Sequence, residues 1–449
     1  MAGAPDAVII GGGFAGLSAA TSLAERGAKV VVLDARPRLG GRATAFADRT
    51  TGEMVDNGQH VLFGCYHRTL DFLRRIDALD RVRIQPRLEV PYLDTAGRRS
   101  VLKCPPLPAP LHLLAAVLRW EAIPWRDRLS ALRLAAPLAR GRQELNRSGR
   151  VSADPPGTVS EWLKAHGQRD RLRAWLWEPL AIAALNQPPD LAAASPFVRV
   201  LAGLFGTAAG DAAIVLPTVP LDQMYAEPAR RYIEARGGEV RLNALARVVV
   251  AGGRVDGVEV RGERLAADHV VAAVPWFALR ALFASGSAPA LEPVLSAADA
   301  MASMPIVTVN LWYDRPVMDD AFVGLPGRMA QWVFDKRLVF GRTASHLSLV
   351  SSAAIELDTA GREELVALAA REIAGALPGA RAAQLVRGTV VRERRATFSL
   401  AAGQPPRPAA RTAIGGLALA GDWIDTGLPG TIESAVVSGE MAATALLGN

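Results

Sequence analysis

Cysteine, lysine and long apolar runs are all scarce in this chain of 449 residues. The two cysteines, Cys65 and Cys104, cannot form a disulfide framework, so we expect both to be reduced and structural. No apolar run reaches the length of about eighteen residues that a membrane-spanning helix needs. The six histidines show no metal-ligand spacing, which predicts that no metal is bound.

The charge of the chain is positive but dispersed. The formal net charge is +7, and most of the basic residues are arginines scattered among alanines, leucines and acids. Because no basic cluster is interleaved with aromatic residues, nucleic-acid binding is excluded and a mild attraction to anionic lipid is favoured. The N-terminus lacks the charged start of a signal peptide, so we expect a cytoplasmic protein.

The N-terminal segment has the layout of a dinucleotide-binding βαβ unit. An apolar run at 7–10 leads into the glycine turn 11–16, a helix of small residues follows at 17–26, and a second apolar run at 30–33 ends in Asp34. A strand, a glycine turn, a helix and a strand ending in a carboxylate are typical of this unit. The sequence therefore predicts a nucleotide cofactor held at the turn.

Each residue of the turn has a predicted task. Gly11 permits the tight turn, Gly13 lets the backbone approach a pyrophosphate, and Gly16 lets the helix contact the strand closely. Phe14 and Ala15 lie between the last two of these glycines, and the helix that follows points its N-terminal N–H groups at the phosphates.

Residues 36–42 narrow the choice of nucleotide cofactor. Gly41 belongs to a second glycine pair, and Arg42 after it can place a guanidinium on the same pyrophosphate. Asp34 lies at the spacing that reaches a ribose hydroxyl, and an acid there argues against the 2′-phosphate of NADP. The stretch resembles the FAD-binding segment of the amine oxidase and phytoene desaturase superfamily.

Two later segments match the same superfamily. Residues 56–64 correspond to the stretch that passes the isoalloxazine ring, where Gly58 would allow close backbone approach. Residues 421–425 resemble the C-terminal flavin motif, in which an aspartate contacts the ribityl chain and the next helix points its N-terminus at the flavin N1/O2 edge. Ala246 matches a position whose backbone meets the adenine.

The resemblance thus implies non-covalent FAD, since neither cysteine lies near the C-terminal motif. The predicted cofactor-binding residues are Gly11, Gly13, Phe14, Ala15, Gly16, Asp34, Ala35, Arg36, Gly41, Arg42, Gly58, Gln59, His60, Ala246, Gly421, Asp422, Thr431 and Ile432.

The predicted fold is α/β, with two interleaved domains. A Rossmann-type FAD-binding domain with a parallel sheet takes residues 1–75, 215–275 and 385–449. An α+β substrate-binding domain takes residues 76–214 and 276–384.

Two amphipathic helices are predicted at 111–120 and 125–138, within a segment, 105–140, that has two interpretations. Its apolar stripes either belong to ordinary core helices or form a membrane-facing surface with tryptophans and arginines at the interface. The residues of the stripes are Leu111, Leu114, Ala115, Leu118, Leu129, Leu132, Leu134 and Leu138, with Trp120 and Trp125 at the helix ends.

The chain as a whole resembles the hydroxysqualene dehydroxylases, the squalene-associated, FAD-dependent, desaturase-like enzymes of bacterial hopanoid pathways. The more discriminating stretches are 177–180 and 184–189, and 428–435 agrees as well. The resemblance implies reduction of hydroxysqualene, a long apolar isoprenoid, to squalene by FAD that an external reductant has reduced. It implies a dry tunnel and an acid for the leaving hydroxyl.

His60 and Glu178 are the candidates for that acid. His60 is a titratable ring beside the flavin segment, although a structural histidine is an equal interpretation. Glu178 precedes a proline in a tryptophan-rich stretch, where desolvation would raise its pKa. The alternative functions are a carotenoid desaturase and, at greater distance, an amine oxidase or a non-catalytic flavoprotein that binds polyprenyl lipid.

Overall fold

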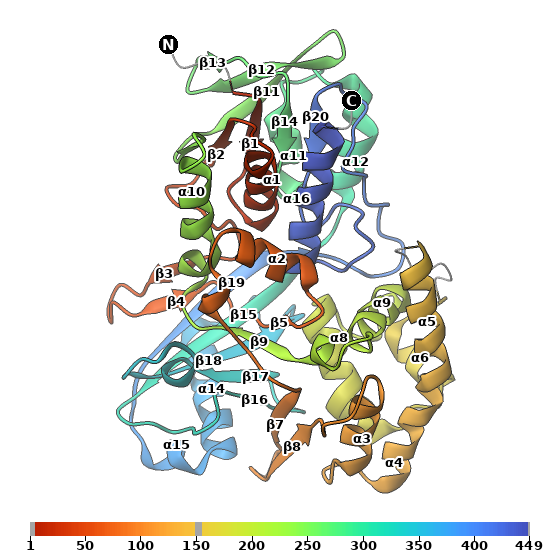
Figure 1. Ribbon diagram of the computed structural model, residues 1–449. Helices are drawn as coiled ribbons and strands as arrows, with labels where there is room; N and C mark the ends of the chain where they lie inside the picture. The colour runs from red at the N-terminus through yellow and green to blue at the C-terminus, as the bar shows by residue number, and fades with distance from the viewer. Residues whose placement is uncertain (1–4, 149–154, 448–449) are drawn as a thin grey trace.

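A five-stranded parallel sheet forms the upper half of the molecule in a computed structural model that describes residues 5–148 and 155–447 (Figure 1). The strands, in spatial order, are β10 (Glu239–Arg241), β2 (Val30–Leu33), β1 (Ala7–Ile10), β14 (Val270–Ala272) and β20 (Leu417–Leu419). All neighbouring pairs are parallel, so segments from the start, middle and end of the chain share one sheet. This sheet confirms the predicted Rossmann-type α/β class.

Both faces of this sheet are buried, which explains why its strands are continuous apolar runs. In β1, Ala7 and Ile9 enter the core on one face, and Val8 and Ile10 enter the core on the other. The first face is covered by α1 (Phe14–Glu25), α2 (His67–Arg75), α10 (Glu227–Glu234) and α16 (Ile432–Leu447). The second is covered by α11 (Trp276–Leu279), α12 (Glu292–Ala300) and a meander of β11 (Ala246–Ala251), β12 (Arg254–Val260) and β13 (Glu263–Leu265).

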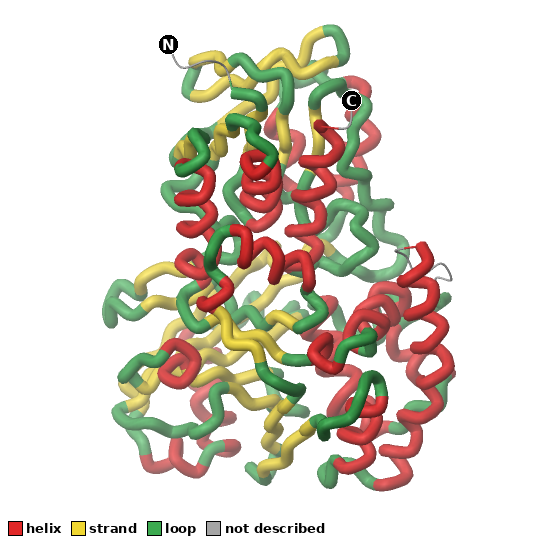
Figure 2. Tube along the Cα trace, in the orientation of Figure 1, coloured by secondary structure: helices red, strands yellow, loops and turns green. Residues whose placement is uncertain are grey.

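A seven-stranded mixed sheet forms the lower half, as the strands in Figure 2 show. Its spatial order is β19 (Leu385–Phe398), β15 (Ser303–Tyr313), β18 (Ser345–Ser352), β17 (Trp332–Asp335), β16 (Phe322–Gly324), β7 (Glu89–Leu93) and β8 (Arg99–Lys103). On one face lie α14 (Arg362–Ala376) and α15 (Pro378–Ala382). Short sheets join the halves: β3 (Ala45–Ala47) with β4 (Met54–Asp56), and β5 (Leu62–Phe63) with β9 (Ile214–Pro217) and β6 (Val82–Ile84).

Helices gather on the other face of the seven-stranded sheet. They are α3 (Leu111–Arg119), α4 (Trp125–Ser130), α5 (Ala135–Ser148), α6 (Val159–Ala165), α7 (Asp170–Leu172), α8 (Glu178–Leu185) and α9 (Ala194–Leu204), with α13 (Lys336–Phe340) between β17 and β18. Short turns of 3₁₀ helix lie at Leu79–Arg81, Ala131–Leu134, Ala209–Ala212, Arg280–Leu282 and Pro289–Leu291, and π-helical turns lie at Arg173–Trp177 and Asp222–Ala226.

Two segments differ from the sequence expectation. Residues 385–398, assigned above to the FAD-binding pieces, form β19 and pair with β15 in the seven-stranded sheet. The helix expected over 125–138 is interrupted by a 3₁₀ turn, because Pro137 has no N–H to donate to the preceding turn.

The apolar stripe expected on α3 is also not the side of the helix that the structure buries. The buried residues of this helix are His112, Leu113, Ala116 and Val117. Leu111 is exposed, and the rest of the expected stripe is half-buried.

Candidate active site

The glycine turn after β1 is too crowded to accept side chains. Gly11 has a φ of +112°, and a Cβ there would lie 2.3 Å from the carbonyl oxygen of Ala273. A Cβ on Gly16 would lie 1.9 Å from the carbonyl oxygen of Gly11, so α1 rests directly on the turn. The N-cap residue of α1 is Gly13, which offers no side-chain cap. The first N–H groups of the helix are therefore free to bind an anion.

A second glycine loop faces this turn. A Cβ on Gly41 would lie 3.4 Å from the Cα of Gly13, so the two loops meet backbone to backbone. The loops are joined by the N–H of Gly40, which donates to the carbonyl of Gly12 at 2.8 Å. A cradle of backbone N–H groups without side chains fits a pyrophosphate, as a dinucleotide cofactor requires.

The carboxylate of Asp34 is buried beside the same turn. It accepts the N–H groups of Gly12 and Arg36, each at 2.8 Å. A carboxylate has about four acceptor sites, so it can still accept a ribose hydroxyl. The carbonyl of Asp34 accepts the N–H of Ala244 at 2.8 Å, which brings the segment that leads to the buried Ala246 alongside.

An ion pair between Arg42 and Asp422 joins the first and last pieces of the predicted cofactor site. Arg42 also donates to the carbonyl of Ala396 at 2.8 Å and lies over the ring of Trp276, 5.4 Å from its centroid. Gly421, before the aspartate, has a φ of +152°. Two residues 380 positions apart are thus in contact.

The N-terminus of α16 lies against the same aspartate. Thr431 caps this helix by accepting the N–H of Ser434 at 3.2 Å. The hydroxyl of Ser434 in turn donates to the carbonyl of Asp422 at 3.0 Å. Ile432, the first residue of α16, therefore lies at a helix terminus whose partial positive charge favours an electron-rich partner.

A buried lysine holds the segment that follows β4. The Nζ of Lys336 lies 2.6 Å from the Oδ2 of Asp56, donates to the side-chain oxygen of Gln59, and lies 4.1 Å from the ring centroid of Phe340. Burial lowers the pKa of Lys336, and the charge of Asp56 opposes that shift. The sequence alone does not single out this residue, because it stands between two other charged residues, Asp335 and Arg337.

The ring of His60 is hydrogen-bonded to the backbone two residues earlier. Its Nδ1 lies 2.9 Å from the carbonyl oxygen of Gly58, which has a φ of +89°. Burial lowers the pKa of His60, and the charge of Asp56 works in the opposite direction. The imidazole is therefore neutral near neutral pH.

An apolar cavity adjoins this segment. It encloses about 1270 Å³, including the part open to solvent. Among the described residues that line it, none carries a charge; the uncharged polar ones include Gln59, Tyr66, Tyr92 and Ser352. The aliphatic lining includes Val61, Leu88, Val90, Leu102, Leu113, Ala116, Val117, Leu176, Leu180, Ala183, Leu204, Ala212, Ile214 and Val350.

Aromatic rings form one wall of the cavity. The ring centroids of Tyr92 and Trp332 lie 5.9 Å apart, and Phe322 lies 6.3 Å from Trp332 and 6.0 Å from Phe334. The faces of such rings carry partial negative charge and attract a cation that is shielded from water.

Neither predicted acid lines this cavity. Gln59 and Val61 line the cavity, but His60 between them does not. Trp177 also lines it, whereas the next residue, Glu178, does not. Burial raises the pKa of Glu178, and neighbouring basic side chains oppose that effect.

Tyr66 is a polar residue that does line the cavity, and the sequence alone does not mark it. Its hydroxyl is hydrogen-bonded to Thr431 at the start of α16. Burial raises the pKa of Tyr66, so the phenol stays protonated and can donate. The ring thus connects the apolar cavity with the helix that the flavin is predicted to meet.

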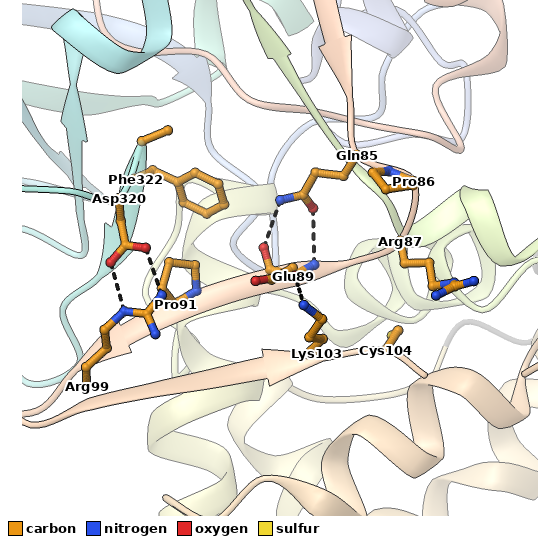
Figure 3. Close-up of a pocket in the computed structure, with 11 residues that line it drawn as sticks. Gln85, Pro86, Arg87, Glu89, Pro91, Arg99, Lys103, Cys104, Asp320 and Phe322 are labelled. Carbon is orange, nitrogen blue, oxygen red and sulfur yellow. Dashed lines mark hydrogen bonds and ion pairs between the residues drawn. The ribbon is translucent and has the colours of Figure 1, made fainter. Parts of the chain in front are cut away.

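A polar hollow lies on the other side of β7 (Figure 3). Glu89 and Pro91 face this hollow, whereas Val90 faces the apolar cavity, because alternate residues of a strand point to opposite sides. Arg99 forms two hydrogen bonds with Asp320, at 2.9 and 2.8 Å. Charges that are paired in this way leave a poor site for an apolar ligand.

A dinucleotide cradle beside an uncharged cavity is the arrangement of an oxidoreductase that uses a bound nucleotide cofactor on an apolar substrate. Residues 14–447 match the sequence profile of the flavin containing amine oxidoreductases. The chain belongs to this family. It is therefore a flavoprotein, and its dinucleotide-binding unit identifies the flavin as FAD.

Named relatives of nearly the same length are similar to this chain. Hydroxysqualene dehydroxylase of Rhodopseudomonas palustris is 32% identical over 453 residues, covering 98% of this chain and 97% of that protein. Hydroxysqualene dehydroxylase of Zymomonas mobilis is 29% identical over 452 residues, covering 98% of this chain and 99% of that protein. The 15-cis-phytoene desaturase of Synechococcus elongatus is 26% identical over 460 residues, covering 98% and 95%.

Solved structures support the fold. An oxidoreductase from Methanosarcina mazei aligns with a TM-score of 0.75 at 16% identity, covering 99% of this chain and all of that one. The chain thus has the fold of FAD-dependent oxidoreductases, as predicted.

Proposed function

We propose that this enzyme reduces hydroxysqualene to squalene. The observation that carries the proposal is the large uncharged cavity, which is lined by Gln59 and Tyr66 from the segments predicted to bind the flavin or to contact them. Loss of an allylic hydroxyl leaves a delocalised cation, and a cavity that excludes water protects such a species. The relatives named for this reaction align with 98% of the chain.

The atoms of the reaction balance without a further substrate. The allylic carbon–oxygen bond breaks, the hydroxyl takes up one proton and leaves as water, and a hydride forms the new carbon–hydrogen bond. FAD, when bound and reduced by an external donor, supplies the hydride. The chain excludes water from the substrate and presents the rings of Tyr92 and Trp332 to the cationic carbon chain.

The predicted cofactor residues have matching tasks in this proposal. The loops at Gly13 and Gly41 would hold the pyrophosphate, and Asp34 the ribose. Asp422 would bind the ribityl chain, and Thr431 and the start of α16 would face the flavin edge. Because neither Cys65 nor Cys104 lies near the C-terminal flavin motif in the sequence, we expect FAD to be bound without a covalent link.

Tyr66 is our candidate for the group that touches the leaving hydroxyl. It lines the cavity, it is a donor, and its own oxygen is held by Thr431. The roles predicted for His60 and Glu178 stay predictions, and His60→Ala and Glu178→Gln test them.

The test of Tyr66 is a single-turnover measurement with reduced enzyme. Tyr66→Phe should slow flavin reoxidation by hydroxysqualene by about a hundredfold, the scale of a lost donor in catalysis. Tyr92→Phe removes a second phenol of the same cavity and should retain most of the rate. Equal rates for both variants would remove Tyr66 from the mechanism.

The test of the proposed reaction uses anaerobically reduced enzyme. Hydroxysqualene should give squalene with one flavin reoxidised for each molecule formed. If oxidised enzyme instead converts phytoene to a conjugated polyene, the alternative assignment, a carotenoid desaturase, replaces this one. Flavin that binds but reacts with neither substrate would point to a lipid-binding flavoprotein.

An amine oxidase is the less favoured alternative. An acid is the side chain that pairs most strongly with a cationic amine, and the described lining of the cavity contains no acid. Trp423, the aromatic residue of the C-terminal motif, is fully buried and donates its N–H to the carbonyl of Val274 at 2.9 Å. This ring therefore does not face a substrate.

The proposal includes the location of the enzyme. Two free thiols suit the reducing cytoplasm. No helix of the described residues is both long and apolar enough to cross a bilayer. An apolar substrate stored in lipid favours peripheral association with the inner face of the cell membrane.

A further inference from the structure

Large apolar side chains are exposed on α3 and α4 and in the segment before and after them. Trp125 is 63% exposed and Leu111 is 53% exposed. We call the set the outer helical face: Leu107, Leu111, Trp125, Leu129 and Leu132. These two helices lie at the lower end of the molecule, away from the five-stranded sheet (Figure 1). Exposed apolar residues in one short segment mark an interaction site more often than residues scattered singly.

The charges of this segment have one predominant sign. Residues 105–140 contain five basic and two acidic residues, a net charge of +3 in a chain whose total is +7. One of the acids, Asp127, is buried and paired with Arg169 at 3.1 Å. Arg126 lies over the ring of Trp125, 5.7 Å from its centroid. Tryptophan, leucine and arginine together suit the boundary between acyl chains and anionic headgroups.

The opposite side of α3 is a wall of the apolar cavity. Leu113, Ala116 and Val117 line the cavity, and they are among the buried residues of this helix. Leu111 lies on the same helix and is exposed. One helix thus separates the proposed substrate site from the outer helical face. A lipid substrate that leaves a bilayer beside Leu111 would therefore meet the helix that also lines the cavity.

A second copy of the chain is a less suitable partner. A two-fold contact would place this arginine-rich surface against itself, and like charges that face each other oppose association. An anionic bilayer pairs with the same charges.

We propose that the outer helical face docks the enzyme on an anionic lipid bilayer, with α3 between the bilayer and the substrate cavity. The route into the cavity rests on the proposed function, whereas the docking does not. The helices lie in the interface and do not span the membrane.

The test is sedimentation with vesicles of phosphatidylcholine and phosphatidylglycerol in equal parts. The holoenzyme should bind these vesicles more tightly than vesicles of phosphatidylcholine alone, and added salt should weaken the binding. The variant Leu111→Glu/Trp125→Glu should lower the partition coefficient by at least about tenfold. The control, Ile355→Glu/Val386→Glu, changes side chains that are 51% and 65% exposed elsewhere and should bind like the wild type.

Turnover separates docking from catalysis. Leu111→Glu/Trp125→Glu should retain turnover of detergent-solubilised hydroxysqualene and lose at least about tenfold with substrate embedded in vesicles. Failure of wild-type enzyme with detergent-solubilised substrate would contradict the proposed function and leave vesicle binding as a separate result. Equal sedimentation of both double variants would overturn the docking proposal. The docking proposal would also be overturned if the wild type were a dimer that Leu111→Glu/Trp125→Glu converts to a monomer, with no change in the amount of enzyme that sediments with vesicles.

Discussion

Lys336→Met should strongly destabilise the enzyme, because it breaks a buried ion pair at the base of the site. The Nζ of Lys336 lies 2.6 Å from the Oδ2 of Asp56, and both side chains are almost inaccessible to solvent. At that distance and an effective dielectric constant of about 20, the gross attraction is about 6 kcal/mol. Desolvation offsets part of it, and loss of one partner from such a pair costs about 3–5 kcal/mol, since the remaining charge is buried alone.

The double variant Lys336→Met/Asp56→Asn isolates the cause. Methionine keeps most of the volume of the lysine stem, and asparagine can still accept the N–H of Leu221, which Asp56 accepts at 3.2 Å. Removing both charges should restore more than half of the lost stability.

The assay is urea unfolding of FAD-saturated protein, followed by tryptophan fluorescence. The order of midpoints should be wild type, double variant, then Lys336→Met. A Lys336→Met midpoint equal to that of the wild type would refute the reasoning. A double variant no more stable than the single one would show that lost packing, not the unpaired carboxylate, is the cause.

Three further predictions concern the cofactor site and the pH dependence of stability. Gly16→Ala should yield protein without flavin absorbance, because the added Cβ would lie 1.9 Å from the carbonyl oxygen of Gly11; normal FAD content would show that the turn can relax. Arg42→Ala should weaken FAD binding in equilibrium dialysis by about tenfold or more, with only partial recovery in Arg42→Lys, which lacks the planar fork; full recovery by lysine would contradict this. Burial raises the pKa of Asp48, but hydrogen bonds from Arg387 and two backbone N–H groups outweigh this and lower it to about 2 from 3.8. A lowered folded-state pKa stabilises the fold above the unfolded value, so Asp48→Asn should cost about 2 kcal/mol at neutral pH. The difference from wild type should shrink as pH falls from about 4 to about 2, and a pH-independent difference in urea midpoints would argue against the ion pair.

The cofactor site could be predicted piece by piece because each piece is local. The strand, glycine turn and helix around Gly11 and Gly16 lie in one continuous segment, and the required backbone geometry admits no other residue type there. The contact between Arg42 and Asp422 has no local signal, since its partners meet only when β1 and β20 enter the same sheet.

The proposed acid shows the limit of the same reasoning. His60 stands beside the flavin segment in sequence, yet its neighbours Gln59 and Val61 line the cavity and His60 does not. Which residue of such a segment faces inward depends on the neighbouring strands. Tyr66 becomes visible only when the cavity is assembled.

The sequence by itself determined the cofactor class and the α/β architecture, because glycine turns and buried parallel strands have requirements that appear in a few consecutive residues. Tertiary structure decided what lies against the flavin and which side of α3 meets solvent. That helix carries apolar residues on both sides, so its periodicity does not identify an inner face. Only the packing of α3 on the seven-stranded sheet buries Leu113 and Val117, leaves Leu111 exposed and encloses the cavity.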